Sequence, residues 1–181
     1  RIGGNDDLRR YFGKKVKDAD AVSYVPVIAL FAIAALMAGA ISWLTMGSLL
    51  SVMTIETFIA VAMCLIAVPK LQDVDAFATM FLGYDLLARR WLPYAYIYPF
   101  AEGLAGVLML ARALDWVSIP VALFIGSVGA VSVFYAVYVQ KRDIKCACVG
   151  GSSRVPLGFV SLTENVMMVA MALWMASGAA M

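Results

Sequence analysis

The 181-residue sequence contains no histidine and only three cysteines, Cys64, Cys146 and Cys148. The absence of histidine excludes haem with histidine ligation, zinc sites of mixed cysteine and histidine type, and a histidine general base. Three thiols are too few for an iron–sulfur cluster held by four cysteines of one chain. What remains is chemistry through sulfur, either electron transfer or the binding of soft metals.

Charge is also scarce. Only 14% of the residues are charged, against about 25% in typical soluble domains, while 64% are hydrophobic. A soluble protein of this size could not bury so much apolar surface, so the solvent around the chain must be lipid. The sequence begins with Arg1 and no signal-peptide pattern, and we expect the full gene product to begin further upstream.

The apolar residues form five segments long enough to cross a bilayer, which needs about 20 residues. We therefore predict an all-α integral membrane protein with a membrane domain over residues 21–181 and a cytoplasmic linker over residues 1–20. Residues 71–90 carry apolar side chains at helical spacing between aspartates, and we predict an interfacial helix there. The predicted spans are Tyr24–Leu44, Val52–Val68, Leu92–Leu114, Ser118–Tyr138 and Ser161–Ser177.

The basic residues predict the orientation. Thirteen of the 14 lie on alternate loops and only Arg112 lies on the other side. Because cytoplasmic loops carry an excess of Lys and Arg, the N-terminus is expected in the cytoplasm and the C-terminus in the periplasm of a bacterial inner membrane. The lipid bilayer is the partner that this composition implies, and no nucleic-acid partner is expected.

Cys146 and Cys148 stand one residue apart in a basic loop on the predicted cytoplasmic side. Neighbouring Arg142 and Lys145 would stabilise a thiolate and make it nucleophilic. A disulfide between residues i and i+2 closes a small strained ring, and strained disulfides exchange readily. A structural disulfide is not expected in the cytoplasm. Two other interpretations stay open: ordinary loop thiols, and binding of a soft metal such as Cu(I) or Hg(II).

Two further residues within the spans are candidates. Cys64 is either a small packing residue or a thiol that relays electrons from the Cys146/Cys148 pair. Glu102 is the one carboxylate predicted deep in a span, three residues after Pro99. A protonated Glu102 could serve proton-coupled thiol chemistry or bind a quinone headgroup, or it could simply hydrogen-bond a neighbouring helix.

The remaining polar and small residues have structural interpretations. Glu56 is interpreted as a solvated residue near the end of a span. Ser161-Leu-Thr-Glu164 fits a capping box that opens the fifth helix. Gly103-Leu-Ala-Gly106 and Gly126-Ser-Val-Gly129 are typical of helix surfaces that pack closely.

Between Lys70 and Trp174 the chain carries a series of short motifs. They are Lys70-Leu-Gln-Asp73, Phe77, Tyr84-Asp-Leu-Leu, Pro99-Phe-Ala-Glu102-Gly, Lys145-Cys-Ala-Cys148-Val-Gly-Gly and Val155-Pro-Leu-Gly-Phe-Val-Ser-Leu-Thr-Glu164. In these motifs the chain resembles the MauE/DoxX family of redox-associated membrane proteins. The resemblance implies that the last four spans form a MauE/DoxX-like bundle. It also implies a link to periplasmic disulfide and cofactor maturation, as in methylamine dehydrogenase biogenesis.

Residues 1–12 resemble the last segment of a glutaredoxin. The resemblance implies that Gly3, Gly4 and Asp6 help to bind glutathione at a helix N-terminus. The segment holds no glutaredoxin active-site cysteine, so it cannot itself exchange thiols. A complete domain upstream would lie on the same membrane face as Cys146 and Cys148.

These observations together predict a membrane thiol–disulfide electron-transfer protein, between a cytoplasmic glutaredoxin-type donor and a membrane or periplasmic acceptor. Its candidate catalytic residues are Cys146, Cys148, Glu102 and Cys64. No cofactor is firmly implied, and the candidates are glutathione through an upstream domain and quinone. The alternatives are a non-enzymatic accessory subunit of a larger membrane complex and a soft-metal-binding membrane protein.

Overall fold

A computed structural model describes residues 24–142, 144 and 156–178, and within these ranges the chain is helical without a β-strand. Five of the helical segments are long and apolar enough to cross a bilayer. This confirms the predicted all-α membrane fold. The helices are α2 (Val25–Met46), α3 (Val52–Gln72), α4 (Val74–Leu82), α5 (Leu92–Ala111), α6 (Asp115–Phe134), the π-helix η1 (Tyr135–Val139) that continues α6, and α7 (Phe159–Ala176).

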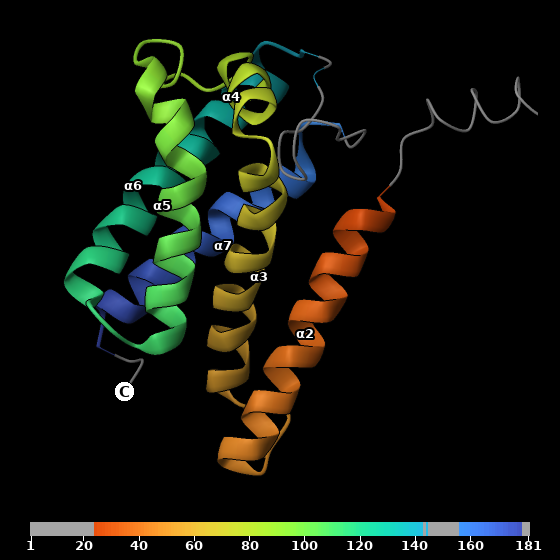
Figure 1. Cartoon of the computed structure of the whole chain (residues 1–181), viewed down its shortest axis with the longest axis vertical. Helices are drawn as coiled ribbons and strands as arrows, with labels where there is room; N and C mark the ends of the chain where they lie inside the picture. Colours follow the sequence, from red (N-terminus) through yellow and green to blue (C-terminus); the bar gives the residue numbers. More distant parts are fainter. Residues whose placement is uncertain (1–23, 143, 145–155, 179–181) are drawn as a thin grey trace, which may run out of the picture.

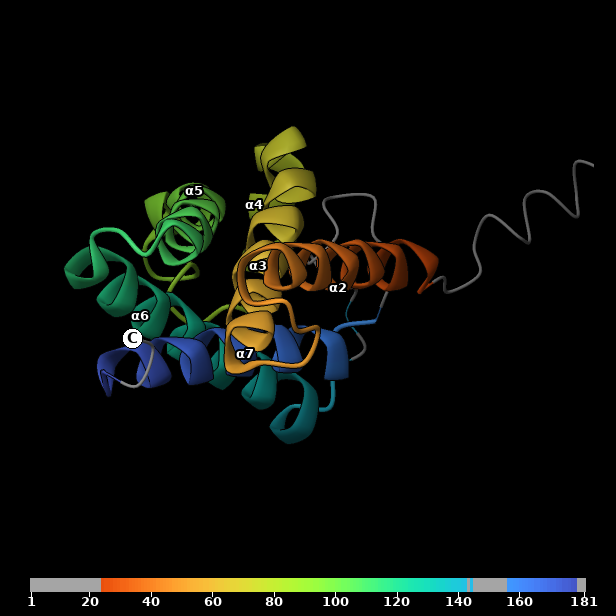
Figure 2. The ribbon, with the colours of Figure 1, turned by 90° about the horizontal axis from the view of Figure 1, so that it is seen from below.

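Helices α3, α5, α6 and α7 form the bundle. Helix α3 packs against α5 and α7, and α6 packs against the same two helices. Among the described helices α2 contacts α3 alone, and it leans away from the other four (Figures 1 and 2). Most of the surface of α2 is therefore left to lipid or to a partner.

Local sequence explains where the helices begin. Pro26 and Pro93 lie in the first turns of α2 and α5, where a missing N–H costs nothing and the fixed φ suits a helix. Ser51 opens α3 with a capping box, because its side chain accepts from Thr54 N while the Thr54 side chain accepts from Ser51 N. Gly47 adopts a left-handed conformation, φ 67°, that ends α2.

The predicted interfacial helix is present as α4, at the end of the bundle that lies uppermost in Figure 1. The Asp73 side chain accepts from Ala76 N and so opens α4 directly after α3 ends. The side chains of Phe77, Ala78 and Phe81, which belong to α4 itself, are buried. Helix α4 therefore closes one end of the bundle with aromatic side chains.

The glycine stripes are packing surfaces, as predicted. A Cβ added at Gly106 would lie 2.9 Å from Cys64 Sγ and 3.0 Å from Ala60 O of α3. A Cβ at Gly129 would lie 2.1 Å from Asn165 Oδ1 of α7. Only glycine lets these helices approach so closely.

We expect Gly129→Ala to lower the stability of the protein by about 1–3 kcal/mol, because the added methyl group overpacks the α6–α7 contact. Gly39→Ala on α2 is the control, since its Cβ would meet only Leu49 Cδ2 at 3.7 Å. Alanine also favours a helix over glycine by up to about 1 kcal/mol. Thermal unfolding in one detergent compares the two variants. Equal midpoints would contradict the close contact at Gly129.

Candidate functional site

The candidate site is a buried ion-pair cluster that joins three helices. Lys70 of α3 is 3% exposed, and its Nζ donates to both carboxylate oxygens of Glu102 on α5, at 2.9 and 2.7 Å. The same Nζ donates to Glu164 Oε1 of α7 at 2.6 Å. Glu102 is completely buried and Glu164 is 6% exposed. We call Lys70, Glu102 and Glu164 the Lys70 cluster.

The charge balance of the Lys70 cluster allows it to bind one proton. One ammonium faces two carboxylates, so the fully ionised cluster carries one net negative charge inside the bundle. Burial of an uncompensated charge is costly, and a proton on either carboxylate makes the cluster neutral. The arrangement can therefore hold one proton and release it without exposing an unpaired ammonium.

Aromatic rings form the wall of the site. Lys70 Nζ lies 5.3 Å from the centre of the Tyr98 ring and 5.9 Å from that of Phe77, within the range of cation–π attraction. Tyr98 donates to Asn165 Oδ1 at 3.4 Å, and Asn165 Nδ2 donates to Ser161 O at 2.7 Å. A cavity of about 10 Å³ beside these groups has room for about one water molecule.

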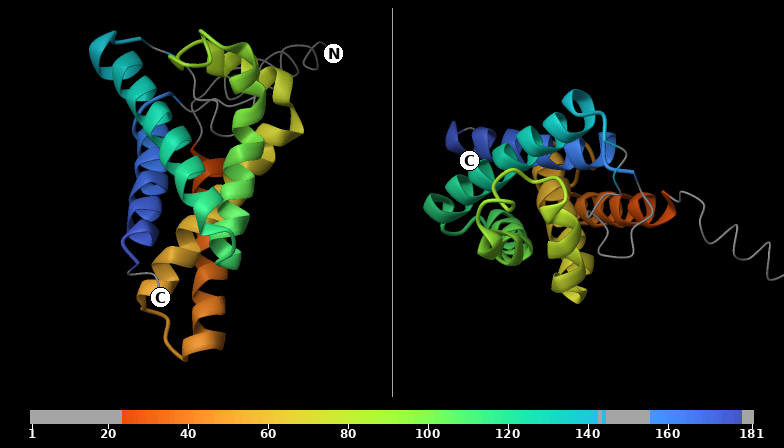
Figure 3. Two further views of the ribbon diagram at one scale, coloured as in Figure 1. Left: turned by 90° about the vertical axis from the view of Figure 1, so that its left-hand side faces the viewer. Right: turned by 90° about the horizontal axis from the view of Figure 1, so that it is seen from above.

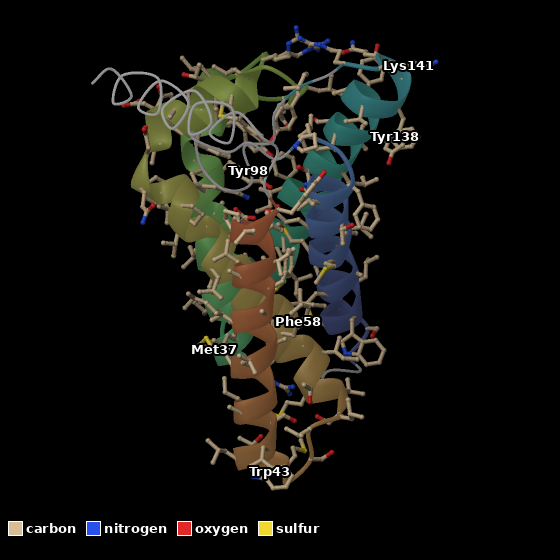
Figure 4. All side chains as sticks on the ribbon, turned by 90° about the vertical axis from the view of Figure 1, so that its right-hand side faces the viewer. Met37, Trp43, Phe58, Tyr98, Tyr138 and Lys141 are labelled. Atoms are coloured by element: carbon tan, nitrogen blue, oxygen red, sulfur yellow. The ribbon has the colours of Figure 1, made fainter. Side chains whose placement is uncertain are left out.

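The cluster lies in the half of the bundle that faces the α6–α7 connection. Figure 4 shows Tyr98 inside this half, toward the end marked by Lys141 and away from Trp43. Leu157 N donates to Ile144 O at 2.7 Å, so the described residues on either side of the 145–155 segment are joined. Glu164 follows the start of α7 at Phe159 by about 7.5 Å along the axis.

The sequence interpretation missed two members of the cluster. Lys70 was assigned to a loop, but α3 runs through Pro69 to Gln72 and buries the ammonium. The capping-box interpretation of Glu164 was wrong, because α7 begins at Phe159 and its N-cap, Gly158, makes no side-chain cap. Glu102 is buried as predicted, but the expectation that it stands alone deep in the spans was wrong.

Glu56 is also not the solvated residue that the sequence indicated. It is 7% exposed, and it accepts from Trp174 Nε1 at 2.8 Å and from Arg112 Nη2. The signal that could have found this pair is the charge count, since Arg112 is the one basic residue predicted on its side of the membrane. Residues Glu56, Arg112 and Trp174 tie α3, α5 and α7 at the opposite end from Lys70.

The predicted cysteine and glutathione-binding residues are placed only in part. Cys64 of α3 is half-buried as a free thiol, and its Sγ lies 4.0 Å from Gly103 O of α5. Cys146 and Cys148 lie outside the described residues, and so do Gly3, Gly4 and Asp6. Within residues 24–142, 144 and 156–178, no group of three or more His, Cys, Asp or Glu side chains could hold a metal.

Asp85, in the connection from α4 to α5, is a third buried carboxyl group in the half of the bundle that holds the Lys70 cluster. Its Oδ1 accepts from Leu87 N at 3.0 Å and Ala88 N at 2.8 Å, while Oδ2 has no partner among the described residues. Burial raises the pKa of Asp85 above its ordinary value. Burial also raises the pKa of Tyr84, helped by the charges of Glu164 and Asp85.

We expect Lys70→Met to destabilise the protein by about 3–5 kcal/mol, because it leaves two buried carboxylates without their cation. Lys70→Met combined with Glu102→Gln should recover part of this loss, since the double variant removes one of the unpaired charges. Arg112→Met is the comparison and should cost less, because Arg112 is 46% exposed. A double-mutant cycle by thermal unfolding measures the coupling. A coupling near zero would contradict the Lys70 cluster.

We expect Asp85→Asn to stabilise the protein increasingly as the pH rises from about 4 to 7. A folded-state pKa above the unfolded value of about 3.9 means that the contribution of Asp85 is full at low pH and declines as the folded group ionises. Asparagine keeps the acceptor for Leu87 N and Ala88 N and cannot ionise. Unfolding midpoints of both proteins across this pH range test the expectation, and parallel curves would contradict it.

Comparison with known proteins supports the family resemblance. The family described as Methylamine utilisation protein MauE matches residues 46–178, which include α3 to α7 and every member of the Lys70 cluster. Neither the curated proteins nor the solved structures include a significant match. The match covers well over half of the chain, and the protein is therefore a member of the MauE family of multi-pass membrane proteins.

Proposed function

We propose that this MauE-family protein carries out thiol–disulfide electron transfer at the membrane, with Cys146 and Cys148 as the exchanging thiols and the Lys70 cluster as their proton site. The observation that carries the proposal is the Lys70 cluster itself. It places one ammonium and two carboxylates inside an apolar bundle, about one and a half helical turns from the start of α7. Intramembrane ionisable groups are expensive and mark functional sites more often than packing contacts.

The exchange balances in two steps. A dithiol donor of the glutaredoxin type reduces the Cys146–Cys148 disulfide: the donor's S–S bond forms, the protein's S–S bond breaks, and two protons end on Cys146 and Cys148. A disulfide acceptor in or beyond the membrane then takes the electron pair: the acceptor's S–S bond breaks, the Cys146–Cys148 disulfide forms again, and two protons end on the acceptor thiols. The Lys70 cluster can hold one of these protons in transit because its two carboxylates share a single cation. The second proton leaves its thiol for the solvent and is replaced from the solvent at the acceptor.

The same proposal includes an electron donor and a role for the remaining candidate residues. A glutaredoxin-type domain upstream of residues 1–12, with Gly3, Gly4 and Asp6 at its glutathione site, would supply electrons on the same side. Cys64 lies six residues before Lys70 on α3, about 9 Å along the axis, and is the candidate for a relay thiol. Its close contacts with Gly103 and Gly106 of α5 favour the packing role.

The proposed location is a bacterial inner membrane with the N-terminus and the 145–155 segment in the cytoplasm. With Lys70 buried inside the bundle, twelve of the 14 basic residues still belong to the N-terminal segment, the α4–α5 connection and the α6–α7 connection. Arg112 lies alone at the other end. This asymmetry supports the orientation.

A second candidate function is that of a non-enzymatic accessory subunit. The observation that favours it is the isolation of α2, which packs against α3 alone among the described helices. A groove between these two helices is lined by Ala35, Ala38, Thr54, Ile55 and Phe58. Small residues in such a groove would let a helix of a larger complex approach closely.

Titration of the purified protein against glutathione redox buffers separates the two functions. We expect a two-electron transition that Cys146→Ser with Cys148→Ser abolishes and Cys64→Ser retains. Glu102→Gln should slow exchange by about 10²-fold, the scale of a lost acid–base group, without removing the transition. A double serine variant that behaves as the wild type in cells would instead support the accessory role. The orientation has its own test: a membrane-impermeant maleimide should label Cys146 and Cys148 in inverted membrane vesicles but not in intact cells.

A further inference from the structure

A pocket lies at the opposite end of the bundle from the Lys70 cluster. It has a volume of about 210 Å³, and its walls come from α2, α3, α5, α7, the start of α6 and the connection between α5 and α6. Figure 3 shows the end of α7 and the beginning of α3 at the same end of the bundle, where Trp174 Nε1 of α7 donates to Glu56 Oε1 of α3. Glu56 and Arg112 lie at the pocket, and Arg112 is 46% exposed, so the pocket is accessible from this membrane face.

Four methionines line the pocket. Met53 comes from α3, Met109 from α5, and Met171 and Met175 from α7. Met171 and Met175 are four residues apart and therefore share one face of their helix. Met109 and Met171 are buried, at 2% and 4% exposed. Four of the chain's 11 methionines thus meet at one place, on three different helices.

The charge of the pocket favours a monovalent cation. The lining includes two carboxylates, Glu56 and Asp115, and one guanidinium, Arg112. The ionised set therefore carries one net negative charge. An anionic ligand would be repelled, whereas a single positive charge would be neutralised.

The type of donor atom in the pocket determines which cation it would prefer. Thioether sulfur is a soft ligand that suits Cu(I), whereas Zn²⁺ prefers thiolate or imidazole and Mg²⁺ prefers oxygen. The sequence has no imidazole, and the residues that line the pocket include no cysteine. Methionine side chains are flexible enough to converge on an ion in a pocket of this size.

We propose that Met53, Met109, Met171 and Met175 form a thioether site for one soft monovalent metal ion, Cu(I), with Glu56 and Asp115 compensating its charge. The site lies outside the thiol chemistry proposed above and does not depend on it. It involves no electron transfer, and the ion enters and leaves as Cu(I).

The test uses full-length protein in detergent, purified through a histidine-free tag, with Cys64→Ser, Cys146→Ser and Cys148→Ser to remove all thiols. Titration with Cu(I) under reductant, against a chromogenic Cu(I) chelator, should show one bound equivalent. Met109→Leu with Met171→Leu conserves volume and apolar character but removes two sulfurs. It should weaken Cu(I) binding at least tenfold. Met37→Leu is the matched control, since Met37 lies on the outer surface of α2 (Figure 4) and should leave binding unchanged.

Ag(I), which is redox-inert, should follow the same pattern as Cu(I). Equal thermal midpoints of the leucine variants and their parent would establish that the fold is intact. Absence of bound Cu(I) in the cysteine-free protein would overturn the proposal, and so would equal affinity in the Met109/Met171 double variant. An organic molecule that co-purifies and remains bound after both leucine substitutions would identify an apolar ligand pocket and would also overturn it.

Discussion

The structure depends most on the ammonium of Lys70. A lysine inside an apolar bundle is tolerated only where anionic partners surround it, and here Glu102 and Glu164 reach it from two other helices. These contacts fix the rotation of α3, α5 and α7 about their own axes, because each helix must turn its charged side chain toward the same point inside the bundle. The rings of Phe77 and Tyr98 then exclude solvent around it, so α4 and the first half of α5 belong to the same arrangement.

The same three helices are joined a second time at their other ends. Glu56 of α3 meets Arg112, which follows α5, and Trp174 of α7. Along α3 the two ties are 14 residues, or about 21 Å, apart. Helix α6 is held against α7 through close contacts at Gly126 and Gly129. Polar contacts thus orient three helices, and close packing through small residues adds the fourth.

The sequence predicted the membrane helices well because long apolar runs have one physical solution in a bilayer. Each predicted span has its helix, and the interfacial helix is present as α4. The ion pairs were not predictable in the same way. Lys70 follows a proline, and a charge beside a proline looks like the end of a span. Glu164 stands three residues after Ser161, so a local capping motif explained it without any distant partner.

The residues that were found and those that were missed differ in how far their signal extends along the chain. Gly106 and Gly129 each belong to a Gly-x-x-Gly motif that is recognisable within four residues of sequence, and both lie at helix–helix contacts. Lys70 and Glu164 are 94 residues apart, and nothing local connects them. Charged side chains in apolar segments should therefore be paired across spans before any one of them is given a local role.

The position of the Lys70 cluster also constrains any redox chemistry at the adjacent membrane face. Thiol–disulfide exchange moves protons with its electrons, and an apolar bundle offers little room for water to receive them. A cluster with one cation and two carboxylates can change its protonation while Lys70 stays paired, so the helices need not move when a proton arrives or leaves. A lone carboxylate in the same place would alternate between a neutral and an unpaired charged state. In the proposed function, the second carboxylate, from Glu164, keeps Lys70 paired whichever carboxylate holds the transferred proton.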